Sequence, residues 1–328
     1  MSFYYAADGK KFNSKIEALK YKNSTGIQIG LYYHDDVYSK VDWKTEPPGS
    51  LDFYYKEQAQ RLRDQYDYLI LCYSGGYDST NILETFFYNN IKLDKIVIVG
   101  AFSQDSEVGS DENHNGELYN NAFPTIKKMG LESITEIYDY TERFDNIDSF
   151  SISQYSSEWT HTTGGWFSPH NWWWKDAGNI IVPKNLGSKR AAIIFGRDKP
   201  TVVGKKFYFY DTAITSYGNI QSSDNYDVIN FYWDPNFTPI LVKQLHVLKN
   251  TPNVFLPTVE KYIYNLKNPL IFKSPKSPTT LLSLRDQYLH KKKNSRVHDL
   301  YVSGLKNISS FIDPRQMRTI HSVGYSFF

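Results

Sequence analysis

The stretch YSGGYDS (73–79) constrains the fold most, because it directly follows the apolar run YDYLILC (66–72). A short, continuous apolar run bounded by turn residues is typical of a strand that is covered on both faces of a parallel sheet. Beyond the motif, apolar residues recur at helical spacing, at Ile82, Leu83, Phe86 and Phe87. The stretch therefore predicts a strand, a tight glycine turn and a helix over 79–90.

This arrangement suits a bound phosphate. A helix that begins directly after a glycine turn points backbone N–H groups and the positive end of its dipole at one spot. Glycines allow close backbone approach, serine hydroxyls add donors, and the Asp78 carboxylate is a hard oxygen ligand of the kind Mg²⁺ prefers. The motif is neither a Walker A loop, since no GKS or GKT follows, nor a GxGxxG fingerprint.

Strand and helix patterns alternate along the middle of the chain, which predicts a parallel sheet with crossover helices. The expected elements are helix 52–64, the motif strand 68–73, strand 95–102, helix 115–130, strand 134–140 and strand 191–196. Ligands in such sheets bind at the carboxyl ends of the strands. We therefore expect the chemistry at 74–79, 101–114 and 196–200.

Three regions are expected in total. Residues 1–50 form a small N-terminal α+β segment, with FYYAADGKKF as two strands around a DG turn. Residues 51–210 form the twisted α/β domain with flanking helices. Residues 211–328 form a basic, mainly helical or irregular C-terminal region that packs on it and contains a helix over 238–250.

Composition limits the class of protein. Hydrophobic content of 41% and charged content of 22% over 328 residues are typical of a soluble globular chain. No stretch approaches the roughly 18 apolar residues of a membrane span, and no signal-peptide pattern is present. The one cysteine, Cys72, allows no internal disulfide and no CxxC motif, and lies in the predicted strand as a small buried hydrophobe. We expect a cytoplasmic protein that does not interact with membranes.

The net charge of +2 conceals an asymmetry. Residues 241–328 carry 14 Lys and Arg against 4 Asp and Glu, most densely in HKKKNSR (290–296). A solvated surface is one explanation, and contact with a phosphate-rich partner such as nucleic acid is the other.

The sequence SGGYDS resembles the SGGxDS signature of the PP-loop ATP pyrophosphatases, an adenine nucleotide alpha hydrolase-like family that includes the synthetase domain of asparagine synthetase. The wider layout of residues 50–250 is similar to the short asparagine-synthetase-like proteins encoded by bacteriophages. The shared features are RLRDQYDYLIL, the GRDKP turn and FYWDPNFTPILVKQLHVLK (231–249). The resemblance implies a PP-loop (HUP-like) fold, ATP and Mg²⁺ as cofactors, and the host cytoplasm as the location of a phage-encoded chain.

The resemblance also implies roles for individual residues. ATP would be bound by Ser74, Gly75, Gly76, Asp78, Ser79, Thr80 and Gly196. Ser103 is added because it lies just past the predicted strand 95–102, where it could meet the adenine or ribose. Asp78 and Asp198 would hold Mg²⁺, and Lys199 would stabilise charge on the departing pyrophosphate. Asp78, Asp198 and Lys199 are thus the expected catalytic residues. The FGRDKP turn departs from the acidic loop of asparagine synthetases, and an ordinary strand-ending turn is the alternative explanation for it.

Other departures affect the nitrogen source and the chemistry. Ser2 stands where a glutamine-using asparagine synthetase has its catalytic cysteine, and the N-terminal segment of roughly 60 residues is too short for a full glutaminase domain of ordinary size. A separate source of ammonia, or an amine substrate, is therefore expected. Cys72 alone suits neither the sulfur-transferring nor the reductase branch of the family.

Two further segments each allow two interpretations of their role. The polar loop 102–117 gathers Asp105, Glu107, Asp111, Glu112, His114 and Glu117, either as a solvated mobile lid or as a site for an amine or a metal. The segment 158–175 holds five of the seven tryptophans, either in a packed subdomain or in the wall of a pocket or interface.

Three functions remain open. The first is an AMP- and pyrophosphate-forming synthetase that adenylates a carboxyl or carbonyl oxygen of an acyl substrate for attack by ammonia or an amine. The second is a PP-loop enzyme that modifies a nucleic acid or nucleotide, such as phage DNA or tRNA. The third is a non-catalytic ATP-binding phage protein.

Overall fold

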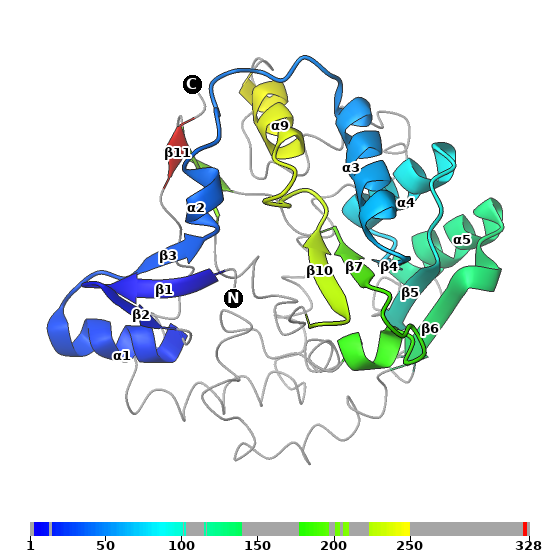
Figure 1. Cartoon of the computed structure of the whole chain (residues 1–328), viewed down its shortest axis with the longest axis horizontal. Coiled ribbons are helices and arrows are strands. Elements are labelled where there is room, and N and C mark those ends of the chain that lie inside the picture. The colour runs from blue at the N-terminus through cyan, green and yellow to red at the C-terminus, as the bar shows by residue number, and fades with distance from the viewer. Residues whose placement is uncertain are drawn as a thin grey trace, which may run out of the picture.

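A five-stranded parallel sheet with helices against it forms the centre of the computed structural model (Figure 1). The structure describes residues 3–12, 15–100, 102, 115, 117–139, 177–196, 201–203, 206–209, 223–249 and 324–326. The strand order is β10-β7-β4-β5-β6, and every neighbouring pair is parallel. The strands are β4 (Tyr68–Cys72), β5 (Lys95–Gly100), β6 (Thr135–Asp139), β7 (Ala191–Phe195) and β10 (Tyr226–Asn230). This confirms the predicted α/β class.

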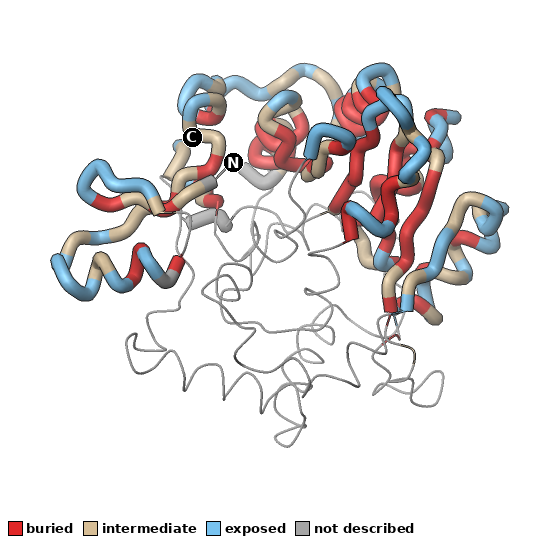
Figure 2. Tube along the Cα trace, turned by 60° about the horizontal axis from the view of Figure 1, so that its bottom comes forward, coloured by how far each residue is buried: buried red, intermediate tan, exposed pale blue. Residues whose placement is uncertain are grey.

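Both faces of the sheet are covered, which explains why its inner strands are mostly apolar (Figure 2). Leu69 and Leu71 of β4 belong to the main core with α3 (Leu51–Gln65), α4 (Tyr77–Tyr88) and α9 (Pro239–Lys249). Ile70 and Cys72 point to the opposite face and pack with the helical segment 177–181. Cys72 is buried, as predicted.

Two helices differ from their predicted bounds. The helix expected over 79–90 is α4 and begins at Tyr77, because Gly76 is its extended N-cap (φ −72°, ψ 167°). The helix expected over 115–130 is instead a π-helical turn, η2 (Leu118–Ala122), followed by α5 (Phe123–Met129). Pro124, near the start of α5, has no N–H to donate to the preceding turn, and its ring clashes with a carbonyl there, so a wider turn precedes it.

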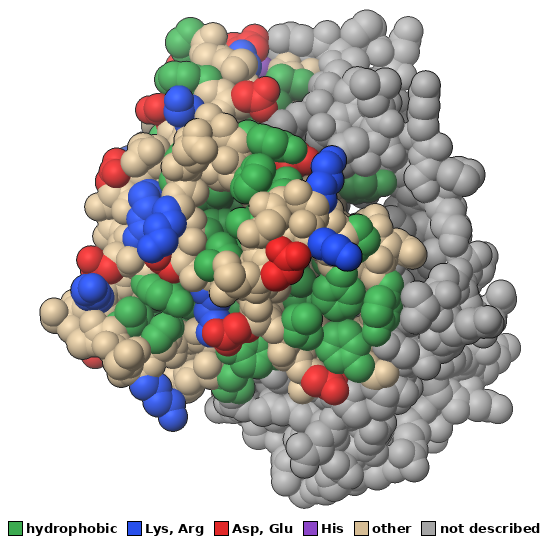
Figure 3. All heavy atoms as spheres, turned by 90° about the vertical axis from the view of Figure 1, so that its right-hand side faces the viewer, with side chains coloured by type: hydrophobic (Ala, Val, Ile, Leu, Met, Phe, Trp, Pro, Cys, Tyr) green, Lys and Arg blue, Asp and Glu red, His purple; other side chains and the backbone are tan. Residues whose placement is uncertain are grey.

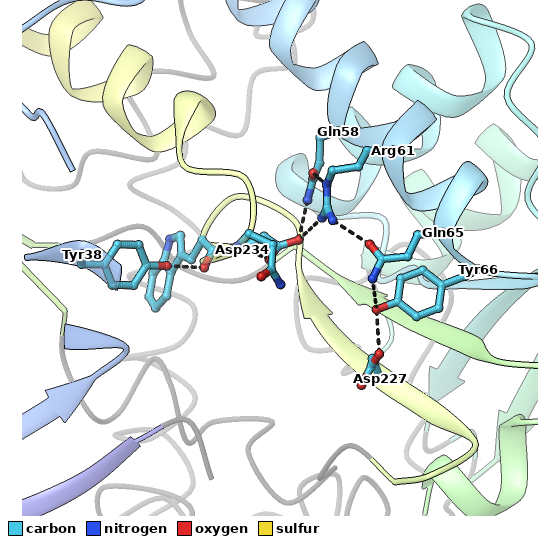
Figure 4. Close-up of polar contacts among 9 residues, drawn as sticks. Tyr38, Gln58, Arg61, Gln65, Tyr66, Asp227 and Asp234 are labelled. Atoms are coloured by element: carbon cyan, nitrogen blue, oxygen red, sulfur yellow. Dashed lines mark hydrogen bonds and ion pairs between the residues drawn. The ribbon is translucent and has the colours of Figure 1, made fainter. Parts of the chain in front are cut away.

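The α/β unit extends past residue 210, where the sequence placed its end. β10 pairs with β7 along its whole length, and α9 follows it. Figure 4 shows how side chains anchor this segment to the end of α3. The buried Asp234 carboxylate accepts from Gln58 at 2.9 Å and forms an ion pair with Arg61. The Tyr66 hydroxyl donates to Asp227 of β10 at 2.7 Å.

The N-terminal segment is α+β, as expected. Its antiparallel sheet has the order β2-β1-β3, with β1 (Phe3–Ala7), β2 (Lys10–Phe12) and β3 (Gly30–Tyr33), and carries α1 (Lys15–Thr25) and α2 (Asp35–Tyr38). The predicted DG turn is confirmed, because Asp8 and Gly9 have positive φ angles of 52° and 72°. β3 was not predicted.

Aromatic rings join this segment to the α/β unit. The rings of Tyr38 and Phe209 pack against each other at a tilt, with 4.7 Å between their centroids. The Tyr38 hydroxyl donates to the Trp233 carbonyl at 2.5 Å. Phe209 directly follows β9 (Lys206–Tyr208). This strand lies in a small antiparallel sheet between β8 (Thr201–Val203) and β11 (Tyr325–Ser326). The high tyrosine content is thus partly explained by a core that buries many tyrosine rings.

The side of the molecule where α4, α5 and β6 lie shows apolar side chains interspersed with charged ones (Figure 3). Among the described residues, no helix has the length and apolar character that crossing a membrane requires. The basic run 290–296, the tryptophan segment 158–175 and residues 103–114 lie outside the described residues.

Candidate functional site

The motif loop turns sharply where β4 ends. Gly75 has a φ of +82°, a conformation that side-chain-bearing residues rarely adopt. A Cβ atom at Gly75 would lie 2.8 Å from the Ala122 backbone nitrogen and 3.0 Å from the Glu117 carbonyl oxygen. Glycine is therefore required here both by the backbone angle and by the close approach of η2.

The two serines of the motif hold the loop together. The Ser74 Oγ accepts from the Gly76 N–H at 3.2 Å and lies 3.2 Å from the Ser79 Oγ. Ser79 Oγ donates to the Gly76 carbonyl at 3.1 Å. These contacts use both hydroxyl protons within the loop. Phosphate contacts by Ser74 and Ser79 remain a prediction, and the geometry favours backbone N–H groups as the main donors.

The N-terminus of α4 is shaped for an anion. Gly76 as N-cap supplies no side chain to the first-turn N–H groups, whereas the Ser50 N-cap of α3 accepts from Phe53. Asp78 is the second residue of α4, so it lies in the first turn of the helix, directly after the glycine loop. The helix start is fixed from outside, because Tyr232 donates its hydroxyl to the Asp78 carbonyl at 2.9 Å and accepts from Asn81 at 2.7 Å.

Gly196, the first residue of the second expected loop, lies beside the motif loop. A Cβ atom at Gly196 would lie 2.9 Å from the Asp78 Cβ and 3.0 Å from the Ser79 nitrogen. This contact exists because β7 and β4 are parallel neighbours, and their carboxyl ends meet at one edge of the sheet. The residues after β7 therefore start directly beside the first turn of α4.

Glu117 reaches the loop from the opposite side, just before η2. Its Oε1 lies 2.9 Å from the position of a Cβ atom at Gly76. Surrounding protein desolvates the carboxylate and raises the pKa of Glu117 to about 7. The residue as a whole is exposed, so solvent limits this rise.

The remaining expected site residues divide into two groups. Thr80 lies beside the strand end, with its Oγ1 3.3 Å from the Tyr73 hydroxyl. Ser103, Asp198 and Lys199 lie outside the described residues, so their expected roles stay predictions. The structure thus brings Ser74–Thr80 and Gly196 together, and adds Glu117 and Tyr232.

The side chains at the loop are compatible with Mg²⁺ that is bound together with a nucleotide. The described residues contain no group of three acidic, histidine or cysteine side chains arranged for a metal. Mg²⁺ bound with a nucleotide needs only one or two carboxylates, because the phosphates supply further oxygens. The loop at Gly75 and Gly76 has two acidic residues beside it, Asp78 and Glu117, and these could supply the one or two carboxylates.

Sequence reasoning missed the roles of Glu117 and Tyr232. Glu117 is one of many acidic residues in a polar loop, and nothing in its spacing separates it from the others. Tyr232 lies 154 residues from Asp78. Comparison with protein-family models and with curated proteins gave no match for this chain.

Proposed function

We propose that this chain binds ATP with Mg²⁺ at residues 74–79 and uses it to adenylate an oxygen of a second substrate, with release of pyrophosphate. The observation that carries the proposal is the shape of the motif loop, residues 74–79, at the start of α4. Gly75 has a left-handed φ of +82°, Gly76 caps α4 without a side chain, and Asp78 lies in the first helical turn. Together these features favour an anion with several oxygens and an accompanying cation.

Backbone groups of the loop would contact the nucleotide, and other residues would hold the loop in position. The first-turn N–H groups of α4 would orient the β- and γ-phosphates, and the two serines would keep the loop in shape. Bound Mg²⁺ would neutralise charge on the departing pyrophosphate. Tyr232 would hold the helix start in position through the Asp78 carbonyl. Asp198 and Lys199, which follow Gly196, would approach from the β7 side.

Product analysis with α-labelled ATP tests this function. The protein would be incubated with Mg²⁺, ammonium or amines, and a panel of carboxylic and amino acids. We expect labelled AMP and an equal amount of pyrophosphate in the presence of an accepted acyl substrate. Labelled ADP with inorganic phosphate would instead identify an ordinary ATPase, and the proposed chemistry would have to be abandoned.

A second candidate, modification of a nucleic acid, is favoured by the charge asymmetry. Residues 241–328 carry 14 basic against 4 acidic side chains. Neutralisation of nucleic acid phosphates by such a segment makes affinity fall steeply with salt. Binding of tRNA and of duplex DNA measured at several salt concentrations distinguishes this candidate, since a small-molecule synthetase should bind neither with a steep salt dependence.

A further inference from the structure

Glu117 lies on the surface of the motif loop. Its carbonyl oxygen is 3.0 Å from the position of a Cβ at Gly75, and its side-chain Oε1 is 2.9 Å from that of a Cβ at Gly76. The residue therefore contacts both glycines of the motif, through its backbone and through its carboxylate. Any side chain at Gly76 would take the space that the carboxylate occupies.

This carboxylate has no partner that neutralises it within the described part of the chain. Two carboxylates that are largely buried do have one. Asp94 pairs with Arg63 at 2.6 Å, and Asp234 pairs with Arg61.

An anion at this place conflicts with the proposed binding of phosphates. Phosphate oxygens held at the N-terminus of α4 would face a carboxylate that touches the same glycine. Like charges that lie close together repel each other. A divalent cation shared by the carboxylate and the phosphates turns the repulsion into attraction, and Mg²⁺ prefers such oxygen ligands.

We propose that Glu117 is a ligand, directly or through a bound water, of the Mg²⁺ that accompanies the phosphates of ATP. This inference rests on the proposed function. It adds a carboxylate that no motif marks, on the β5 side of the loop, to Asp78 on the α4 side. It also makes a specific statement about ATP: Glu117 opposes binding of the metal-free nucleotide and supports binding of the Mg²⁺ complex.

Calorimetric titration of ATP, with excess Mg²⁺ and separately with EDTA, tests the inference in Glu117→Gln, which keeps the shape but removes the charge. We expect about 10-fold tighter binding than wild type in EDTA, and about 10-fold weaker binding in Mg²⁺, which is the usual effect of a single charged interaction. Glu132→Gln, at an exposed glutamate of the short helical turn Glu132–Ile134, is the matched control and should behave as wild type in both titrations.

The outcomes separate the two proposals. Wild type that fails to bind ATP in either condition overturns the proposed function and this inference with it. Wild type that binds in a Mg²⁺-dependent way, with an unchanged Mg²⁺ dependence in Glu117→Gln, overturns the inference alone. Tighter binding by Glu117→Gln in both conditions also overturns it, because Glu117 would then only repel.

A second variant keeps the inference testable where Glu117→Gln does not fold. Glu117→Asp retains the charge but withdraws it by one methylene. We expect unchanged binding of metal-free ATP and about 10-fold weaker binding of Mg²⁺-ATP. Unchanged binding of both forms by this variant would contradict a ligand role.

Discussion

Replacing Gly75 by alanine should destabilise the protein in two separable ways. Its φ of +82° costs an L-residue about 1–2 kcal/mol. The new Cβ would also lie 2.8 Å from the Ala122 backbone nitrogen, and backbone cannot rotate away as a side chain can. Overpacking of this kind adds about 1–3 kcal/mol. The expected loss in the free energy of unfolding is therefore about 2–5 kcal/mol.

Gly187→Ala separates the two contributions. Gly187 also has a positive φ, 63°, but a Cβ there would meet nothing within 4 Å. Its loss should be only the backbone cost of about 1–2 kcal/mol. Urea denaturation of wild type and both variants, followed by circular dichroism, measures the difference. Equal losses in the two variants would refute the close contact between the motif loop and η2.

Two further predictions concern the surroundings of the loop. Tyr232→Phe leaves the Asp78 carbonyl and the Asn81 amide without their hydroxyl partner, so urea denaturation should show a loss of about 1–3 kcal/mol; a loss near zero would contradict it. Burial acts to raise the pKa of Asp94, but hydrogen bonds led by Arg63 outweigh it and lower that pKa. The carboxylate thus stabilises the fold above its unfolded pKa of about 3.9, and this stabilisation is lost as the pH falls through the lower folded pKa. Stability measured from pH 6 to pH 2 should therefore fall less steeply in Asp94→Asn than in wild type, and parallel curves would contradict the shift.

The inner strands could be predicted because burial on both faces makes most of their residues apolar. β7 reads AAIIF, and all five residues are buried. β10 reads YDVIN and gave no such signal. It lies at the end of the sheet, where Asp227 accepts from Tyr66 and Asn230 donates to Tyr33. Polar residues with distant partners hide an edge strand from pattern reasoning, so the α/β unit was expected to end too early.

The same distinction applies to the candidate site. The turn at Gly75 and Gly76 could be predicted because strand, glycines and helix are contiguous in the sequence. The meeting of Gly196 with Asp78 could be expected from the topology, since parallel strands end at one edge. The contact of Glu117 with Gly76 could not, because it depends on how the chain returns through η2 to the loop.

The central claim is that Asp78 and its loop hold Mg²⁺-ATP. Calorimetric titration of Mg²⁺-ATP into wild type, Asp78→Asn and Asp64→Asn tests it most directly, because Asp64 is an exposed aspartate on α3 and serves as the control. We predict that wild type and Asp64→Asn bind with the same affinity, and that Asp78→Asn binds about 10- to 100-fold more weakly, the effect of removing a charged interaction. Equal affinity in all three proteins, unaffected by EDTA, would contradict the claim.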